Sequence, residues 1–259
     1  MITALSIGSG GLGRFGNQLF TIAGVIGSAR KSGQPFAFPH WKNYDNAIFG
    51  DEVTDFETVF ANPLPRIPEN WSWQQYGYFW EFREVYLPNG NWTIDAHMQS
   101  VRFFDHCLDE IRHYFTFKDE YPQNDFVAIH YRAGDYIDHP EAYHPRCSAE
   151  YYDKAIREFP QGTNFLVFSD DMESFKKSIE GYAFGGYKFH LLMGADYIAD
   201  FKKMKSCKSF ITANSSFSHM AALLGTHPEK KIVMPKRWFG TQAGGLNFDS
   251  LYPPNAIVL

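Results

Sequence analysis

The second half of the chain alternates short apolar stretches with segments of helical spacing, and this alternation limits the possible folds more than any other feature. Short strands separated by helices of this length form a parallel sheet, because parallel neighbours need a long crossover connection. We therefore predict an α/β fold with a doubly wound parallel sheet, in which ligands bind at the carboxyl ends of the strands. The expected strands are 126–131, 165–168, 188–192, 209–212 and 231–234, and the expected helices are 149–159, 172–180, 197–205 and 217–224.

The first half of the chain is less regular. The pattern predicts strands at 2–7 and 35–38, a helix at 15–31 and an amphipathic helix at 100–115. Between them, segment 41–91 is rich in Pro, Asn and Trp without a clear period, so long loops are expected there. A length of 259 residues suits two half-size domains with a cleft between them. We place an N-terminal α/β domain at 1–120 and a second α/β domain at 121–259.

Composition narrows the classes of function. A formal charge of -5 and a pI near 6.0 provide no basic excess for nucleic acid. The cysteines Cys107, Cys147 and Cys207 are odd in number and lack the CxxC spacing of a zinc or redox site, which favours reduced thiols in a cytosolic protein. The first 30 residues hold no apolar stretch long enough for a signal peptide or a membrane anchor. We expect a soluble, cytoplasmic protein without a membrane span.

A glycine-rich loop follows the first predicted strand. Residues 8–13 read Gly-Ser-Gly-Gly-Leu-Gly, which fits the dinucleotide pattern GxGxxG, so an NAD-dependent oxidoreductase is one alternative. That fold needs an acid at the end of the second strand, but residues 36–40 read Phe-Ala-Phe-Pro-His and the nearest acid, Asp45, lies beyond them. The loop continues through Arg14, Gly16 and Asn17, where a guanidinium and a carboxamide would face the cleft, although Asn17 also suits a helix cap.

Polar residues follow the predicted strand at 126–131. His130 and Arg132 stand two residues apart and therefore share one face of an extended backbone. A guanidinium offers paired donors to phosphate oxygens, as required where a nucleoside diphosphate departs. A lone strand-end arginine also suits a surface ion pair, but the neighbouring His130, Gly134 and Asp135 favour a functional site. Asp135 is a candidate general base, and anchoring its own loop through backbone amides is the alternative.

Two more clusters follow predicted strands. Asp170 and Asp171 could hold a ribose or a base, cap the next helix, or resemble the acidic pair of metal-dependent transferases. Asn214 or Ser215 is a candidate N-cap, and the exposed amides of a helix start bind phosphate without a metal. An ordinary cap without a ligand fits that segment equally well. The tryptophans of the first hundred residues fit either sugar-stacking surfaces or core packing.

Several motifs in series resemble glycosyltransferase family 11, the α-1,2-fucosyltransferases. They are GRFGNQLF at 13–20, DAHMQSVRFF at 95–104, HYRAGDY at 130–136, CSAEYY at 147–152, FSDDM at 168–172, TANSSFS at 212–218 and PKRWF at 235–239. The resemblance runs from about Gly11 to Phe239. It implies a GT-B architecture of two Rossmann-like domains, GDP-fucose as donor, inversion at the anomeric carbon and no required metal or cofactor.

The resemblance also implies roles for individual residues. Arg132 corresponds to the arginine on the diphosphate, and Asn17 to an asparagine near the reacting centre. The implied donor-binding residues are Arg14, Gly16, His130, Asp170, Asp171, Asn214, Ser215, Ser216 and Phe217, and the implied acceptor-side residues are His97 and Gln99. Ala133 stands where many members carry a second arginine, so Arg14 could supply that phosphate contact. The acceptor would be a galactose-containing glycan held by the first domain. A non-catalytic sugar- or nucleotide-binding protein is the remaining alternative.

Overall fold

The computed structural model describes residues 1–9, 12–43, 54–133, 144–192, 196–241 and 248–259. The chain forms two compact units. Unit 1 comprises 1–119 and 247–251, and unit 2 comprises 120–246 and 252–259. The sequence places its domain boundary after residue 120, and it gives no sign that 247–251 return to unit 1.

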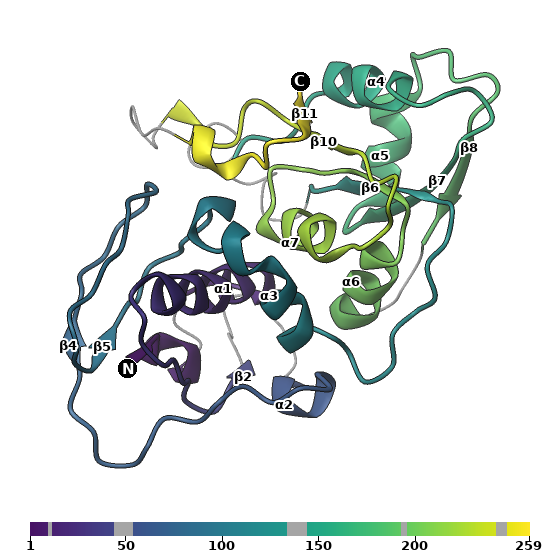
Figure 1. Cartoon of the computed structure of the whole chain (residues 1–259). Helices are drawn as coiled ribbons and strands as arrows, with labels where there is room; N and C mark the ends of the chain where they lie inside the picture. The colour runs from purple at the N-terminus through teal and green to yellow at the C-terminus, as the bar shows by residue number, and fades with distance from the viewer. Residues whose placement is uncertain (10–11, 44–53, 134–143, 193–195, 242–247) are drawn as a thin grey trace. The chain divides into compact units, whose positions relative to one another are not determined.

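Unit 2 is built on a parallel sheet with the strand order β11-β10-β9-β6-β7-β8, and Figure 1 labels all of these strands except β9. Its strands are β6 (Val127–Tyr131), β7 (Asn164–Ser169), β8 (Lys188–Leu191), β9 (Ser209–Ile211), β10 (Ile232–Met234) and β11 (Ala256–Val258). Its helices are α4 (Ala149–Arg157), α5 (Met172–Ile179), α6 (Tyr197–Lys205) and α7 (Ser216–Leu224). The predicted doubly wound sheet is confirmed, and β11 is an addition that the sequence pattern did not reveal.

Local chemistry explains why these elements form. All five residues of β6 are buried, as expected for a central strand with both faces covered. Three of the helices begin at a side-chain cap: Ser148 accepts from the amide of Tyr151, Asp171 from that of Ser174, and Asp196 from those of Ile198 and Ala199. Each cap satisfies donors that the first turn leaves unpaired. The strand ends and helix starts of unit 2 are therefore fixed by short-range signals.

Unit 1 contains a smaller parallel sheet in the order β1-β5-β4 and the helix α1 (Phe15–Lys31), which is buried from Phe15 to Ala29 apart from Asn17. The strands are β1 (Ile2–Thr3), β4 (Gln74–Gln75) and β5 (Trp92–Thr93). The other elements are η1 (Leu5–Ser9), β2 (Lys42–Asn43), β3 (Thr54–Asp55), α2 (Phe56–Val59), η2 (Val101–Phe103), η3 (Asp105–Cys107), α3 (Leu108–Tyr114) and η6 (Asp249–Leu251). The predicted helix at 15–31 is confirmed.

Other predictions for unit 1 need correction. The strand expected at 2–7 ends at Thr3 and gives way to η1, and segment 35–38 contributes only isolated bridges at Phe36 and Phe38. The helix expected at 100–115 is helical only from Leu108, after two 3₁₀ turns. Those turns lie against α1 at Gly27, where a Cβ would overlap the Phe103 carbonyl group. Close packing on α1 thus overrides the apolar periodicity.

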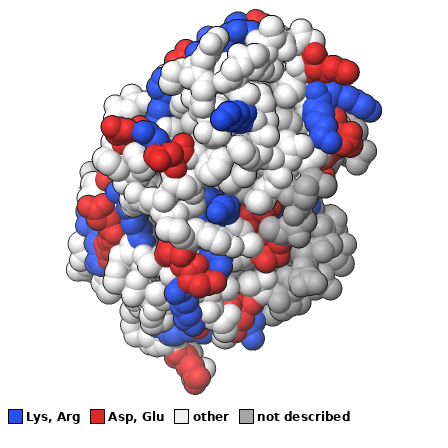
Figure 2. All heavy atoms as spheres, turned by 90° about the vertical axis from the view of Figure 1, so that its right-hand side faces the viewer, with Lys and Arg blue, Asp and Glu red and all other residues white. Residues whose placement is uncertain are grey.

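The apolarity of the helices and the distribution of surface charge both bear on the expected partners. No helix within the described ranges is long and apolar enough to cross a membrane. On the face that Figure 2 shows, acidic and basic side chains lie among one another and among uncharged residues.

Candidate active site

The strand order of unit 2 identifies one end of its sheet as the place for a ligand. From β6 the chain proceeds outward to β7 and β8, and then returns to the other side of β6 as β9, β10 and β11. The order therefore reverses between β6 and β9. In open parallel sheets, ligands bind at the carboxyl ends of the strands beside such a reversal. His130 lies near the end of β6, Arg132 follows β6, and residues 214–217 follow β9.

Arg132 follows β6 directly and pairs with Asp170, which follows β7 directly. Arg132 Nη1 lies 2.7 Å from Asp170 Oδ2. The other carboxylate oxygen, Oδ1, accepts a hydrogen bond of 2.9 Å from the amide of Ala133. Both charged side chains remain partly accessible, with exposed fractions of 20% and 28%. Asp170 therefore orients a guanidinium at the sheet edge.

His130 joins the end of β6 to the first turns of α7. Its Nδ1 lies 2.9 Å from Ser218 Oγ, and its ring packs on that of Phe217 at 5.8 Å between centroids. Burial, assisted by the charge of Arg132, lowers the pKa of His130 to about 3. The imidazole is therefore neutral at physiological pH, and it positions Phe217 and Ser218 without adding a positive charge.

The N-terminus of α7 faces the same edge. Ser215 is the N-cap residue with an extended backbone, which decides between the two predicted candidates, Asn214 and Ser215. Its side chain makes no hydrogen bond to the amides of the first turn. Residues 215–217 are partly accessible. First-turn amides that no cap side chain occupies are suited to bind an anion, with the helix dipole in support.

Asn214 is buried, whereas residues 215–217 are partly accessible. It is 2% exposed, and its Nδ2 donates to the carbonyl oxygens of Pro145 at 2.7 Å and Trp238 at 3.0 Å. Its Oδ1 accepts from Cys147 Sγ at 3.5 Å. The carboxamide thus holds three segments together beneath the start of α7. This contact set gives Asn214 a positioning role at the predicted donor site.

Two tyrosines of α4 support the same strand ends, and sequence reasoning assigned them no role. Tyr151 Oη donates to the Thr212 carbonyl oxygen at 2.6 Å, and Tyr152 Oη donates to the His130 carbonyl oxygen at 2.9 Å. Both side chains are buried. The signal that could have identified them is the pair of phenols within the CSAEYY motif, because buried tyrosine hydroxyls need partners.

Unlike Asp170, which pairs with Arg132, Asp171 caps a helix. Asp171 caps α5, with Oδ1 accepting from the Ser174 amide at 2.9 Å and Oδ2 from the Ser174 hydroxyl at 2.5 Å. These hydrogen bonds keep the pKa of Asp171 below its ordinary value. Asp171 thus makes the capping contacts that the sequence left open. Asp135, the candidate base, lies outside the described residues.

The predicted residues of unit 1 gather at the start of α1. Arg14 is the N-cap residue, and Gly16 and Asn17 lie in the first turn, so Asn17 is not the cap. Asn17 Oδ1 accepts a hydrogen bond of 2.8 Å from Gln99 Nε2. Gly13 has a φ of +80°, and a Cβ at this position would overlap the Asn17 carboxamide. The glycine is thus required for both its backbone angle and its close contact.

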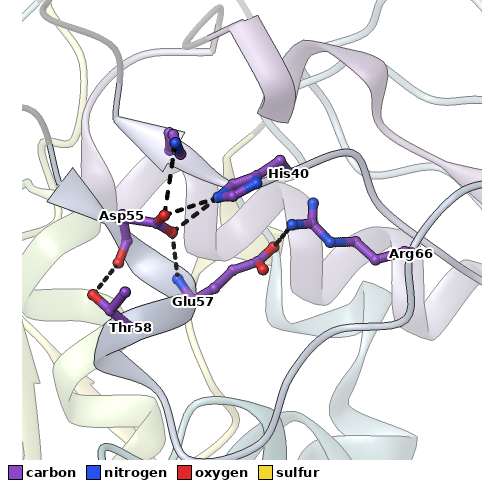
Figure 3. A network of polar contacts seen from close by, with 6 residues as sticks. His40, Asp55, Glu57, Thr58 and Arg66 are labelled. Atoms are coloured by element: carbon purple, nitrogen blue, oxygen red, sulfur yellow. Dashed lines mark hydrogen bonds and ion pairs between the residues drawn. The ribbon is translucent and has the colours of Figure 1, made fainter.

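A second polar network of unit 1 surrounds Asp55 (Figure 3). His40 Nε2 lies 3.0 Å from both carboxylate oxygens of Asp55, and the amide of Glu57 donates to Oδ1 at 3.2 Å. Glu57 in turn pairs with Arg66 at 2.7 Å. Burial acts to raise the pKa of Asp55, but these hydrogen bonds prevail and lower it. His40 lies two residues after the second predicted strand, 35–38, and its partner in this network is Asp55.

Within the described part of the chain, no group of three or more His, Cys, Asp or Glu residues could hold a metal ion.

Two curated proteins of Escherichia coli are similar to about half of this chain. The O-antigen biosynthesis glycosyltransferase WbnK of Escherichia coli is 36% identical over 131 residues, which cover 48% of this chain and 43% of that protein. An alpha-1,2-colitosyltransferase of Escherichia coli is 30% identical over 156 residues, which cover 54% of each chain. The chain thus spans about half the length of the curated relatives it matches.

A solved structure supports the fold. POFUT1 in complex with GDP matches with a TM-score of 0.54 and 14% identity, over 90% of this chain and 97% of that chain. This likeness, together with the parallel sheet of unit 2, confirms the predicted GT-B-like α/β class. The family model for glycosyl transferase family 11 matches residues 22–242, which is most of the sequence. The protein therefore belongs to glycosyl transferase family 11.

Proposed function

We propose that the protein transfers L-fucose from GDP-β-L-fucose to a hydroxyl of a galactose-containing glycan, with inversion and without a metal ion, forming an α-1,2 linkage. The observation that carries this proposal is that the Arg132–Asp170 pair and the first turn of α7 both follow the carboxyl ends of strands of the same parallel sheet. It places a fixed positive charge and helix amides at one sheet edge. Together they suit a leaving diphosphate.

The reaction breaks the bond between the anomeric carbon of fucose and the β-phosphate oxygen. GDP leaves with the electron pair, and an acceptor oxygen attacks the opposite face of the anomeric carbon and loses its proton. Arg132 stabilises the negative charge that grows on the β-phosphate, and the amides of residues 216 and 217 bind the phosphate oxygens. Asn17 is proposed to contact the reacting centre, and Asp135 is proposed as the proton acceptor. Neutral His130 holds Phe217 in place.

The two curated relatives define what the donor experiment must separate. One of them is named for transfer of colitose, so the nucleotide and the sugar of the donor need independent tests. We would incubate the full chain with GDP-fucose, GDP-colitose, GDP-mannose or UDP-galactose, each with lactose as acceptor. Mass and linkage analysis should show an α-1,2-fucosylated galactose. Transfer from the UDP-sugar, or equal transfer from all GDP-sugars, would contradict the proposed donor.

Metal independence can be measured in the same assay. Arg132 and the helix amides supply charge stabilisation that other transferases take from a divalent ion. Transfer should therefore continue in excess EDTA at an unchanged rate. Activity that EDTA abolishes and manganese restores would contradict this part of the proposal.

A further inference from the structure

Several exposed aromatic side chains of unit 1 come from one segment, 71–86. The exposed large hydrophobic side chains of the described residues are Trp71, Tyr78, Trp80, Tyr86, Tyr121 and Val258. Four of them thus come from segment 71–86, which contains β4 and precedes β5. Tyr78 is 50% exposed and Trp80 is 47% exposed. By contrast, Trp41 is a core residue with an exposed fraction of only 2%.

Tyr78, Trp80 and His97 form a cluster that we call the aromatic platform. The rings of Trp80 and His97 lie 4.6 Å apart between centroids, and Tyr78 meets Trp80 edge-on at 5.3 Å. Phe79, between the two exposed rings in sequence, is buried and packs against Phe103 at 5.9 Å. The segment is therefore anchored by Phe79 while its neighbours present their rings to solvent.

The platform continues into a strained turn. Met98, next to His97, is buried and has a φ of +46°, a left-handed conformation that non-glycine residues rarely adopt. The amide of Ser100 donates to the Met98 carbonyl oxygen at 2.8 Å and closes the turn. This turn carries Gln99, whose Nε2 donates to Asn17 Oδ1. Strain of this kind often marks a binding or catalytic site.

We propose that the aromatic platform binds the acceptor by stacking a neutral hexopyranose ring on Trp80, with the Gln99 and Asn17 carboxamides directing a sugar hydroxyl. This inference rests on the proposed function, because it gives the acceptor of that reaction its site. A pyranose has an apolar C–H face and a polar rim. An indole ring matches the face with a rigid apolar surface, and carboxamides match the rim with both donors and acceptors.

The residues around the platform favour a small amphipathic ligand over a protein partner. Gln74, Gln75, Glu81 and Arg83 are exposed in the same segment and interrupt the apolar surface with polar groups and charges of both signs. A protein-docking patch usually presents several hundred Å² of continuous apolar surface. A small cluster of rings with polar neighbours instead fits a single sugar unit, and the mixed charges do not select an anionic sugar.

Saturation-transfer NMR on the full chain tests the platform directly. The probes are methyl β-galactoside, methyl β-glucoside and lactose, and the variants are Trp80→Ala and Trp80→Phe. Tyr86→Ala is the matched control, because Tyr86 is 67% exposed in the same segment and lies outside the platform. At least one glycoside should bind with its C–H face saturated most strongly. Trp80→Ala should weaken that binding about tenfold, Trp80→Phe should restore part of it, and Tyr86→Ala should leave it unchanged.

Glycoside binding is measured without a donor, so it tests the aromatic platform independently of the proposal that GDP-fucose is the donor. The GDP-induced rise in melting temperature should be equal in the wild type and in all three variants, which also shows that they fold. A lost GDP response in the wild type would overturn the proposed function and leave the glycoside result interpretable. Failure of every glycoside to bind, or equal binding to Trp80→Ala, would overturn the platform. Self-association that Trp80→Ala abolishes, without glycoside binding, would make this surface a protein contact instead.

Discussion

Arg132 is compatible with both interpretations that its sequence allows, an ion-pair partner and a diphosphate ligand. It makes an ion pair, as a strand-end arginine commonly does, but its partner Asp170 also receives the Ala133 amide from the loop that follows β6. The carboxylate thus fixes the guanidinium and the backbone next to it. Preorganisation of this kind lets a charge act on a transition state without reorganising first.

Substitution of Arg132 should affect turnover more than binding. In the proposed mechanism, charge grows on the β-phosphate as the glycosidic bond breaks, so the guanidinium would stabilise the transition state more than the bound donor. Arg132→Ala should lower kcat about 10²–10³-fold, and Arg132→Lys should recover little because an ammonium cannot form paired hydrogen bonds. Steady-state kinetics and GDP titration measure the two effects. An unstable variant that stays active per folded molecule would make Arg132 only a structural ion-pair partner.

At the scale of secondary-structure elements, the two units differ in how well sequence predicts them. The helices of unit 2 begin at Ser148, Asp171 and Asp196 and alternate with buried apolar strands, so local signals suffice. In unit 1 the strands of the sheet are two residues long, and the segment after Ser100 adapts its backbone to α1. Such contacts between distant segments leave no periodic trace in the sequence.

In the candidate site, too, local sequence signals predict some features and contacts between distant segments determine others. The strand-end positions of His130, Arg132 and Asp170 follow from the predicted strands, but the pairing of Arg132 with Asp170 depends on β6 and β7 being neighbours. The supporting contacts of Tyr151 and Tyr152 depend on the packing of α4 against the sheet. Sequence therefore identifies the reactive groups more readily than the groups that hold them.

Asn214 provides a test of the support beneath α7. Asn214→Ala would leave the carbonyl oxygens of Pro145 and Trp238 without this donor, and an unsatisfied buried polar group costs about 1–3 kcal/mol. Urea unfolding should show a loss of about that size, with weaker GDP binding as the start of α7 loosens. Asn164→Ala is the matched control, because Asn164 contacts His190 at an exposed position. Equal stability of the two variants would remove the proposed role of Asn214.

At the scale of the whole molecule, two buried histidines link folding to pH. Burial lowers the pKa values of His130 and His219 to about 3 in the folded chain. The ordinary value is 6.5, so the unfolded chain binds protons in this interval that the folded chain does not. The resulting stability is present above pH 6.5 and is lost as the pH falls toward 3.

The slope of the unfolding free energy against pH can be assigned to one histidine by substituting that residue. Near pH 5, each neutral buried histidine contributes about 1.4 kcal/mol per pH unit to the decrease in unfolding free energy. His219→Gln removes one titrating group and should reduce the measured slope by about that amount. Urea unfolding at pH 7, 6 and 5 provides the comparison. An unchanged slope in the variant would mean that His219 has the same pKa in both states.

The two units also offer two possible nucleotide sites, and hydrogen exchange can distinguish them. One is the edge of unit 2 at 130–133 and 212–217, where Arg132 and the start of α7 lie. The other is the glycine-containing segment before α1, which the GxGxxG pattern would assign to a dinucleotide.

GDP should protect the first of these sites. The amides at the start of a helix lack intrahelical partners and exchange readily, so a bound diphosphate should slow them strongly. At about 100 times its dissociation constant, GDP adds about 2.7 kcal/mol, which slows by about a hundredfold any exchange that requires release of the nucleotide. We expect this protection over 130–133 and 212–217 with GDP and little with UDP, and much weaker protection over 12–20, where Arg14 and Gly16 are the implied donor contacts. Protection confined to 12–20 would transfer the nucleotide to the N-terminal glycine segment, and Arg132 would lose its assignment to the diphosphate.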